Sequence, residues 1–178
     1  MFLVIEGMDN TGKTTLARKL EAALKGTYIK SLGHAPVEDQ VKLMDAVLAD
    51  SQDHLIICDR WPTISEEIYG PICRGKSIFS KDIDSQDARF EYHSMLWEAD
   101  AVIIYCRPHR GKVFDTIDER EQMEGVQTHA AALLDAYDKK MAHLADQSLV
   151  VIAYDYETTS MDEIIARVKE EMKKYGKC

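Results

Sequence analysis

The chain has 178 residues, and its 22 lysines and arginines against 31 aspartates and glutamates give a formal net charge of −9. The length fits one domain with a continuous core and argues against a two-domain enzyme. The negative charge argues against nucleic acid as a partner, because non-specific duplex binding needs a broad cationic face. No apolar run approaches the roughly 18 residues of a membrane span, so we expect a soluble protein with no membrane partner. The N-terminal sequence has no cationic leader, which predicts a cytoplasmic location.

Short apolar runs bounded by turn residues recur along the chain and predict five strands. They cover residues 2–5, 28–29, 55–58, 101–106 and 149–153. Segments with helical periodicity lie between them. Near-continuous apolar strands that alternate with helices predict an α/β fold, with a parallel sheet covered by helices on both faces. Ligands in this architecture bind at the carboxyl ends of the strands.

Helical periodicity places apolar side chains on one face of four predicted helices. The first buries Leu16, Leu20, Ala23 and Leu24; a short one between Pro36 and His54 buries Val41, Met44, Val47 and Leu48; a later one buries Leu134, Tyr137, Met141 and Leu144. The last begins at Ser160 with a capping box to Glu163 and buries Ile164, Ile165, Val168 and Met172. Two segments, 70–86 and 107–125, show no regular pattern. The four cysteines form no C-x-x-C pair, and we expect Cys58 and Cys106 to be buried thiols.

A phosphate-binding motif follows the first strand. Residues 7–14 read Gly-Met-Asp-Asn-Thr-Gly-Lys-Thr and match G-x-x-x-x-G-K-[ST] at every fixed position. The glycines let backbone N–H groups close around phosphate oxygens, and the following helix adds its positive N-terminal end. We expect Lys13 to reach the β- and γ-phosphates of ATP, and Thr14 to offer its hydroxyl to Mg²⁺. The predicted nucleotide-binding set is completed by Gly7, Asn10, Thr11, Gly12 and Thr15.

A second polar pair follows the third strand. Asp59 and Arg60 come directly after residues 55–58, so the sheet delivers both to the same edge as the phosphate loop. A carboxylate there can hold or orient a Mg²⁺-bound water, and an arginine can bind a phosphate through two hydrogen bonds. The alternative interpretation is a structural ion pair.

Three classes of phosphate-loop protein compete for this pattern. A switch GTPase would carry an Asn/Thr-Lys-x-Asp motif that reads guanine, and the sequence contains none. A motor or clamp ATPase would usually place Asp-Glu after the equivalent of the third strand, and it needs a longer chain. A small-molecule kinase needs only the phosphate loop, an acceptor site and a cationic lid, so this class fits best.

The same residues resemble thymidylate kinases. Residues 2–15 look like the opening of that family, and Asp59-Arg60-Trp61 resembles its Asp-Arg-aromatic motif; the Ser, Tyr and Arg-Gly positions that follow are matched by Ser65, Tyr69, Gly70, Arg74 and Gly75. The likeness in order and spacing spans nearly the whole chain. It implies a P-loop kinase-type three-layer α/β/α fold with a five-stranded parallel sheet. Residues 1–178 would form one domain, with a short lid at about 107–125.

The resemblance also implies roles for individual residues. Asp9 would lie near the metal and the acceptor, and Arg60 would bind the acceptor monophosphate. Trp61 would belong to the substrate site, and Tyr69 and Arg74 would lie near the nucleotide's sugar, base or phosphate. Asp59 would join Thr14 at the metal.

In one branch of the family an arginine inside the phosphate loop reaches the transferred phosphoryl group, whereas this chain has Asn10 at that position. The catalytic charge would then come from the lid, with Arg120 as the first candidate and Arg107 or Arg110 as alternatives. The resemblance further implies a homodimer formed by helix packing.

Two departures from the family concern the acceptor base. The family usually shows Arg-Glu-Pro-Gly after the second strand, whereas residues 32–36 read Leu-Gly-His-Ala-Pro. The chain also lacks the Phe-x-x-x-Arg segment that stacks on and reads the base. The base must therefore be held differently, and the candidates for stacking, each with core packing as the alternative, are Trp61, Phe79, Phe90, Tyr92 and Trp97. His93 could border the acceptor pocket; the spacing of the six histidines suits no metal.

These observations favour a Mg²⁺-dependent kinase that transfers the γ-phosphoryl group of ATP to a deoxynucleoside monophosphate, with dTMP as the first substrate to test. Two alternatives remain open. A deoxynucleoside kinase would need a carboxylate base, for which Asp59, Glu66 and Asp9 are the candidates. A non-kinase ATP-binding module would regulate a partner through occupancy or hydrolysis.

Overall fold

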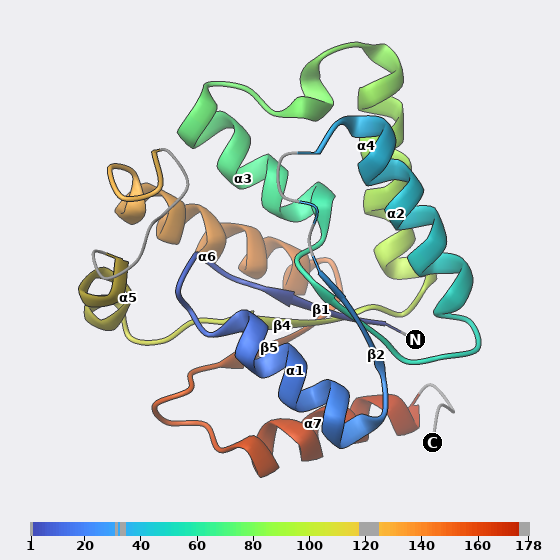
Figure 1. Ribbon diagram of the computed structural model, residues 1–178, viewed down its shortest axis with the longest axis vertical. Coiled ribbons are helices and arrows are strands. Elements are labelled where there is room, and N and C mark those ends of the chain that lie inside the picture. Colours follow the sequence, from blue (N-terminus) through green and yellow to red (C-terminus); the bar gives the residue numbers. More distant parts are fainter. Residues whose placement is uncertain (1, 31, 33–34, 118–124, 175–178) are drawn as a thin grey trace.

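The computed structural model describes residues 2–30, 32, 35–117 and 125–174 of the chain. Five strands form one parallel sheet in the order β2-β3-β1-β4-β5 (Figure 1). The strands are β1 (Phe2–Glu6), β2 (Thr27–Lys30), β3 (Ile56–Asp59), β4 (Val102–Cys106) and β5 (Val150–Tyr154). The predicted α/β fold with a five-stranded parallel sheet is confirmed.

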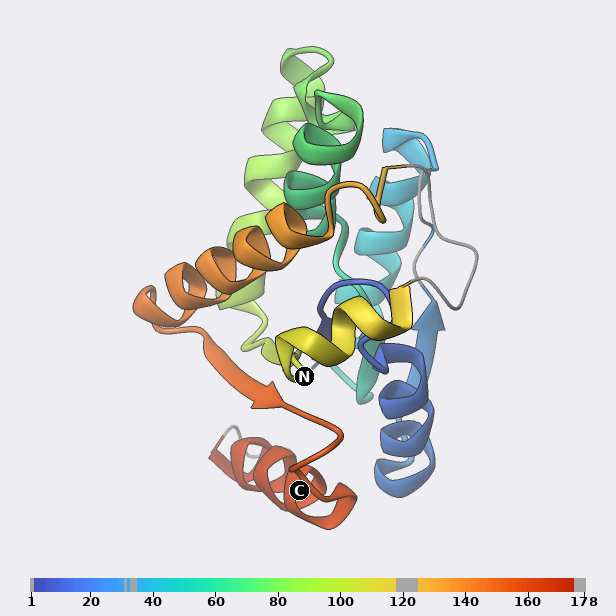
Figure 2. The ribbon, with the colours of Figure 1, turned by 90° about the vertical axis from the view of Figure 1, so that its left-hand side faces the viewer.

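Helices cover both faces of this sheet and make three layers. They are α1 (Lys13–Leu24), α2 (Val37–Asp50), α3 (Pro62–Arg74), α4 (Ile83–Glu98), α5 (Arg110–Ile117), α6 (Ala130–Asp146) and α7 (Met161–Lys174), with a 3₁₀ turn η1 (Ile78–Ser80) before α4. Both views place α1 and α7 on one side of the sheet and α2, α3, α4 and α6 on the other (Figures 1 and 2). Among the described residues, no helix is long and apolar enough to cross a membrane.

The two cores follow from the alternation of side chains along the strands. Phe2 and Val4 of β1 pack in the core that α2, α3, α4 and α6 share, whereas Leu3 and Ile5 pack in the core with α1 and α7. Because both faces of β1 are covered, its residues are fully buried, and the strand is apolar up to its last position. The central strand is thereby fixed in register, and with it the loop that follows.

Three expectations about regular structure were wrong. Residues 70–86 are mostly helical: α3 continues one turn past Pro71 and ends at Gly75 in the left-handed conformation, and α4 begins after Asp82. The carboxylate of Asp82 accepts a hydrogen bond from the main-chain nitrogen of Ser85, which is the cap that starts α4. Residues 107–125 include the helix α5, and the helix predicted as short between Pro36 and His54 is the 14-residue α2. The predicted cap of the last helix is confirmed, since Ser160 accepts from the main-chain nitrogen of Glu163.

The strand register brings the carboxyl ends of the three central strands together. Ile5 of β1 pairs with Asp59 of β3, and Glu6 of β1 pairs with Tyr105 of β4. The chain leaves β1 for α1 on one face and leaves β3 for α3 on the other face. The loop after β1 and the turn after β3 therefore meet at the carboxyl edge of the sheet, which is where open parallel sheets bind ligands.

Candidate functional site

The phosphate-binding motif forms a tight loop between β1 and α1. Gly7 has φ 142° and Gly12 has φ 83°, and the left-handed Asn10 has φ 62°. A Cβ atom on Gly7 would lie 2.5 Å from the main-chain oxygen of Cys106, so the loop passes too close to β4 for any side chain at this position. Gly12 is the N-cap of α1 and has no side chain to cap it, so the first main-chain N–H groups of this helix are suited to an anion.

Hydrogen bonds inside the loop fix its shape and hold its lysine. The hydroxyl of Thr11, which is fully buried, donates to the main-chain oxygen of Met8 at 2.8 Å. The ammonium of Lys13 donates to the same oxygen, and only 7% of the residue is exposed. Burial, followed by the charge of the neighbouring Arg60, lowers the pKa of Lys13 to about 8. The sequence placed Lys13 at the phosphates, and the structure places it inside the loop that would bind them.

A cluster of oxygen atoms lies where α1 begins beside the end of β3. The hydroxyl of Thr14 donates to Oδ2 of Asp59 at 2.6 Å, and the hydroxyl of Tyr28 donates to the same oxygen at 3.1 Å. Hydroxyl and carboxylate oxygens are the ligands that Mg²⁺ prefers, and this ion takes one or two protein ligands when nucleotide phosphates and waters supply the others. Thr14 and Asp59 therefore fit a Mg²⁺ site. The described residues contain no group of three or more histidines, cysteines or acids that could form an all-protein metal cage.

Tyr28 is held in turn by Arg18. The guanidinium carbon of Arg18 lies 3.7 Å from the centre of the Tyr28 ring, which is the geometry of a cation–π contact. The ring therefore has a support on one side, and its hydroxyl points at Asp59. This arrangement could not be predicted from the sequence, because Tyr28 belongs to an ordinary strand pattern.

Arg60 is the centre of a polar network on the other side of the loop. Its guanidinium donates to the hydroxyl of Tyr137 at 2.7 Å and to the hydroxyl of Tyr69 at 3.2 Å, and it forms an ion pair with Asp9. The Tyr69 hydroxyl also accepts from the main-chain nitrogen of Asp9 at 3.1 Å. Only 13% of the Arg60 side chain is exposed. Three predicted site residues, Asp9, Arg60 and Tyr69, are thus in mutual contact.

Two residues of this network were missed by sequence reasoning. Glu6 is fully buried at the end of β1, and its carboxylate accepts from the main-chain nitrogen of Trp61 at 2.7 Å and from the Tyr137 hydroxyl at 3.2 Å. Burial raises the pKa of Glu6, and the nearby Arg60 opposes that rise. The sequence feature that could have indicated a role for Glu6 is its position, as an acid at the end of an otherwise apolar strand. Tyr137 was predicted as part of a core stripe, which is correct for its ring but omits its hydroxyl.

The other candidate cations are already paired with carboxylates. Arg107 makes two hydrogen bonds to Asp138, at 2.7 and 2.9 Å, and Arg110 pairs with Asp135 at 2.7 Å. Both acids belong to α6, so these arginines attach the segment after β4 to that helix. Arg120, the first candidate for the lid arginine, lies outside the described residues.

Arg74 and Glu66 form a further pair within α3. The Glu66 carboxylate, which is 7% exposed, binds Arg74 and also accepts from the main-chain nitrogen of Ile78 at 2.9 Å. Arg74 itself is 31% exposed. The structure therefore anchors Glu66 to both the Arg74 side chain and the main chain at the start of η1.

Trp61 lies in the core and not on the surface of the site. It is 1% exposed, its ring packs 5.1 Å from the ring of Phe2, and its indole nitrogen donates to the main-chain oxygen of Tyr92 at 3.3 Å. Phe79 and Tyr92 are also buried, so three of the five candidate stacking rings are core residues. Trp61 acts by fixing the turn that carries Arg60.

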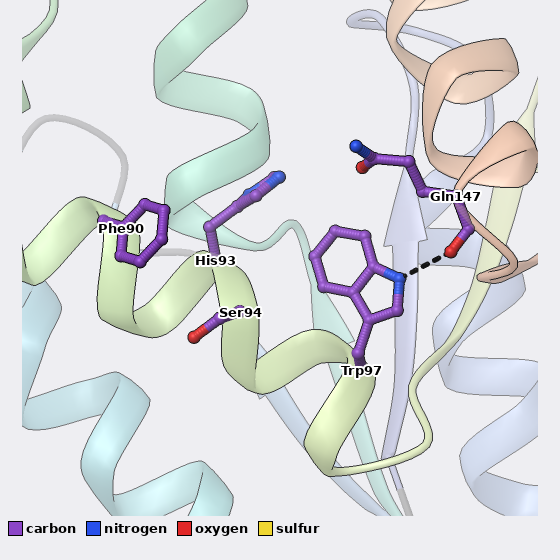
Figure 3. Close-up of a pocket in the computed structure, with 5 residues that line it drawn as sticks. All are labelled: Phe90, His93, Ser94, Trp97 and Gln147. Carbon is purple, nitrogen blue, oxygen red and sulfur yellow. Dashed lines mark hydrogen bonds between the residues drawn. The ribbon is translucent and has the colours of Figure 1, made fainter.

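His93 is not brought to the phosphate loop either. It lines a separate cavity of about 370 Å³ on the outer side of α4, with Phe90, Ser94, Trp97 and Gln147 (Figure 3). None of these residues belongs to the loop or to the Arg60 network. Burial, followed by the charge of Lys140, lowers the pKa of His93 to about 4, so its imidazole is neutral at physiological pH. The expectation that His93 borders the acceptor pocket has no support in its position.

Comparison with solved structures places this fold among nucleotide kinases. The YorR protein of Bacillus subtilis, solved in complex with phosphorylated GDP, superposes with a TM-score of 0.68 at 18% identity, over 98% of each chain. Thymidylate kinase of Candida albicans matches with a TM-score of 0.53 at 15% identity, over 99% of this chain and 92% of that one. Deoxyadenosine kinase of M. mycoides with bound dATP matches with a TM-score of 0.53 at 16% identity, over 97% and 99% of the two chains.

At these identities the similarity establishes the fold. The chain has the fold of P-loop nucleoside and nucleotide kinases, and the family resemblance in its sequence is confirmed at that level. No protein-family model and no curated protein sequence matched the chain. The function must therefore be argued from the site.

The contact between Tyr28 and Asp59 leads to a prediction about the metal. Tyr28→Phe removes the hydroxyl that orients Asp59 but keeps the ring under Arg18, so the apparent affinity for Mg²⁺ should fall roughly 10-fold or more. We would titrate Mg²⁺ against a fluorescent ATP analogue bound to the protein. Binding of the metal-free nucleotide should not change.

Tyr92→Phe is the matched control, because it removes a tyrosine hydroxyl that bonds to Asp45, away from Thr14 and Asp59. Its Mg²⁺ titration should overlay that of the wild-type protein. A Tyr28→Phe titration that also overlays the wild type would show that Asp59 does not need this hydrogen bond.

Proposed function

We propose that the protein is a deoxynucleoside monophosphate kinase that transfers the γ-phosphoryl group of ATP in the presence of Mg²⁺, with dTMP as the first acceptor to test. The observation that carries the proposal is the position of Arg60. A buried guanidinium, fixed by two tyrosine hydroxyls, lies against Asp9 of the phosphate loop. A cation held there suits an acceptor that carries a phosphate.

The chemistry of this acceptor requires no general base. The second pKa of a phosphate monoester is about 6, so the attacking oxygen is already ionised at neutral pH. The barrier lies in bringing two anions together and in stabilising the phosphoryl group as it moves. Lys13 and the N-terminal end of α1 would hold the donor phosphates, and Arg60 would align the acceptor phosphate with them.

Thr14 and Asp59 would hold Mg²⁺, and the bound ion would neutralise part of the charge of the donor phosphates. Asp9 would keep Arg60 oriented until the acceptor phosphate competes for it. We further propose that residues 107–125 act as a lid that excludes water, with Arg120 supplying positive charge to the transferred group.

A deoxynucleoside kinase is the nearest alternative, and it would need a carboxylate base. Asp9 is ion-paired with Arg60 through Oδ1, Glu66 binds Arg74 and the main chain at Ile78 through Oε1, and Asp59 accepts from two hydroxyls at Oδ2. A sugar hydroxyl would have to approach the other oxygen of one of these acids. A neutral hydroxyl would make no use of the buried Arg60 guanidinium, and this favours an anionic acceptor.

A kinase assay over all ribo- and deoxynucleosides and their monophosphates, with ATP and Mg²⁺, tests the function. We expect turnover with one or more deoxynucleoside monophosphates and none with free nucleosides. Phosphorylation of free nucleosides alone would refute the proposal in favour of the nucleoside kinase. Slow ATP hydrolysis that no added nucleotide changes would favour the regulatory module.

Arg60 should be essential for use of the acceptor. Arg60→Lys keeps a positive charge but loses the paired hydrogen bonds, so kcat/KM for the acceptor should fall roughly 100-fold or more, while ATP binding stays near that of the wild type. Arg60→Ala should cost more, and it should also lower the melting temperature because Glu6 and Asp9 lose their cation. Arg167→Ala on the exposed face of α7 is the control. Wild-type kcat/KM in Arg60→Lys would exclude Arg60 as the acceptor ligand.

The three lid arginines should differ in the effect of their replacement by alanine, according to what each side chain contacts. Arg107 and Arg110 are paired with acids of α6, so Arg107→Ala and Arg110→Ala should mainly change thermal stability. Arg120→Ala should lower kcat roughly 100-fold, because the transferred group would lose a positive charge. Single-turnover measurements on the three variants distinguish these effects. If Arg107→Ala alone abolished phosphoryl transfer, the assignment of Arg120 would be wrong.

A further inference from the structure

Helices α3 and α6 lie side by side over the same face of the sheet (Figures 1 and 2). Each of them supplies one tyrosine to Arg60, because Tyr69 belongs to α3 and Tyr137 belongs to α6. The two rings also contact each other edge to face, with their centres 6.0 Å apart. The guanidinium of Arg60 therefore depends on how these two helices are placed relative to each other.

The hydrogen bonds from Arg60 to the two hydroxyls tolerate little movement. The bond to Tyr137 is 2.7 Å long, and the bond to Tyr69, at 3.2 Å, is at the long end of the usual range. A shift of α3 by about 0.5 Å away from α6 would take the longer bond out of hydrogen-bonding range. A contact that keeps α3 at its distance from α6 therefore also keeps Arg60 in place.

An ion pair joins the same two helices. The ammonium of Lys140 in α6 donates to Oε2 of Glu67 in α3 at 2.6 Å. The Lys140 side chain is 16% exposed and the Glu67 side chain is 22% exposed. Most ion pairs on a protein surface contribute little because water and salt screen them. This pair is largely shielded from solvent, so it can tie one helix to the other.

The ion pair lies within one helical turn of both tyrosines. On α6, Lys140 follows Tyr137 by three residues, so the two side chains lie on the same side of that helix. On α3, Glu67 precedes Tyr69 by two residues, so the two side chains leave that helix in different directions. The ion pair and the ring contact together restrain α3 against rotation as well as against separation from α6.

Two basic residues of α4 also lie near Glu67, but neither replaces Lys140. Arg89 lies 3.6 Å from Oε1 of Glu67 and its side chain is 47% exposed, so this contact is longer and more strongly screened. The imidazole of His93 is neutral at physiological pH, and its buried Nδ1 has no hydrogen-bond partner among the described residues. Both belong to α4, so neither can tie α3 to α6.

We propose that Lys140 and Glu67 form a positioning pair for Arg60, which holds α3 against α6 at the distance where Tyr69 and Tyr137 both bind the guanidinium. The pair acts through the two helices that carry these tyrosines. Its effect on phosphoryl transfer rests on the proposed function, in which Arg60 binds the acceptor phosphate. Its effect on the position of Arg60 does not.

The position of Arg60 can be followed without any nucleotide, in the NMR spectrum of the arginine Nε–Hε groups. The signal of Arg60 is the one that Arg60→Lys lacks. Lys140→Met keeps a long side chain and removes its charge, so the Arg60 signal should shift and its exchange with water should become at least about 10-fold faster. Arg89→Met is the matched control, because it removes a cation from the same carboxylate but not from α6. Its Arg60 signal should match that of the wild type, and an unchanged signal in Lys140→Met would overturn the proposal.

Kinetics with the acceptor identified in the kinase assay separate positioning from stability. Lys140→Met should raise the KM for the acceptor roughly 10-fold, change kcat less than about 2-fold and lower the melting temperature, because Glu67 loses its close partner. The double variant Lys140→Met/Glu67→Gln has no unpaired charge, so its melting temperature should rise again. Its KM for the acceptor should stay raised, because α3 and α6 are still not joined. A KM that returns to the wild-type value would show that the pair only balances charge.

The two measurements distinguish failure of this proposal from failure of the proposed function. If no deoxynucleoside monophosphate is phosphorylated, the proposed function is wrong, and the NMR comparison still decides whether the pair positions Arg60. If the kinase assay succeeds but Lys140→Met has the Arg60 signal and the acceptor KM of the wild type, the pair has no positioning role.

Discussion

The side chain of Arg60 joins the phosphate loop, α3 and α6, and the geometry of the site depends on it. It contacts Asp9 in the phosphate loop, Tyr69 in α3 and Tyr137 in α6, and its main-chain nitrogen donates to Ile5 of β1 at 3.0 Å. A charge with so little exposure is stable only when its hydrogen bonds are made, so each contact constrains the others. The backbone of Arg60 is left-handed, with φ 76°, which is a strained conformation for this residue type. The hydrogen bonds around Arg60 maintain this conformation and orient its guanidinium toward the phosphate loop.

Ion pairs explain how an acidic protein can build a cationic site. Three candidate cations each pair with a carboxylate: Arg107 with Asp138 and Arg110 with Asp135, both in α6, and Arg74 with Glu66 within α3. These pairs fix the arginines in place without a broad positive surface. A nucleotide phosphate would then compete with a carboxylate for a guanidinium that is already oriented, so binding would exchange partners and would not have to order a free side chain.

Much of the fold could be predicted from the sequence, because the signals were local. The five strands are apolar runs bounded by turns, and the loop motif fixes the junction of β1 and α1. The errors came where the local pattern was misleading. Residues 70–86 showed no regular pattern, but α3 runs through Gly70 and Pro71. It buries Ile68 and Tyr69 just before them and ends only at Gly75.

The site was harder to predict than the fold, because its key contacts join distant residues. The sequence placed Asp59, Arg60 and Lys13 at one edge of the sheet, but nothing in it showed that Tyr137 of a core stripe reaches Arg60, or that Tyr28 reaches Asp59. Glu6 was visible as an acid at the end of an apolar strand, and its role became clear only from its partners. Trp61 and His93 were predicted to contact the substrate because of their residue type and their position in the sequence. The Trp61 indole is buried in the core, which excludes direct contact. The His93 imidazole lines a separate cavity.

The hydrogen bond between Lys13 and the main-chain oxygen of Met8 has a consequence for selectivity. The ammonium has three N–H donors, and this bond uses one of them. Lys13 is only 7% exposed, so a ligand reaches the ammonium only by entering the loop. Under the proposed function, a polyphosphate chain that extends into the loop would gain this contact, whereas a short anion at its mouth would not.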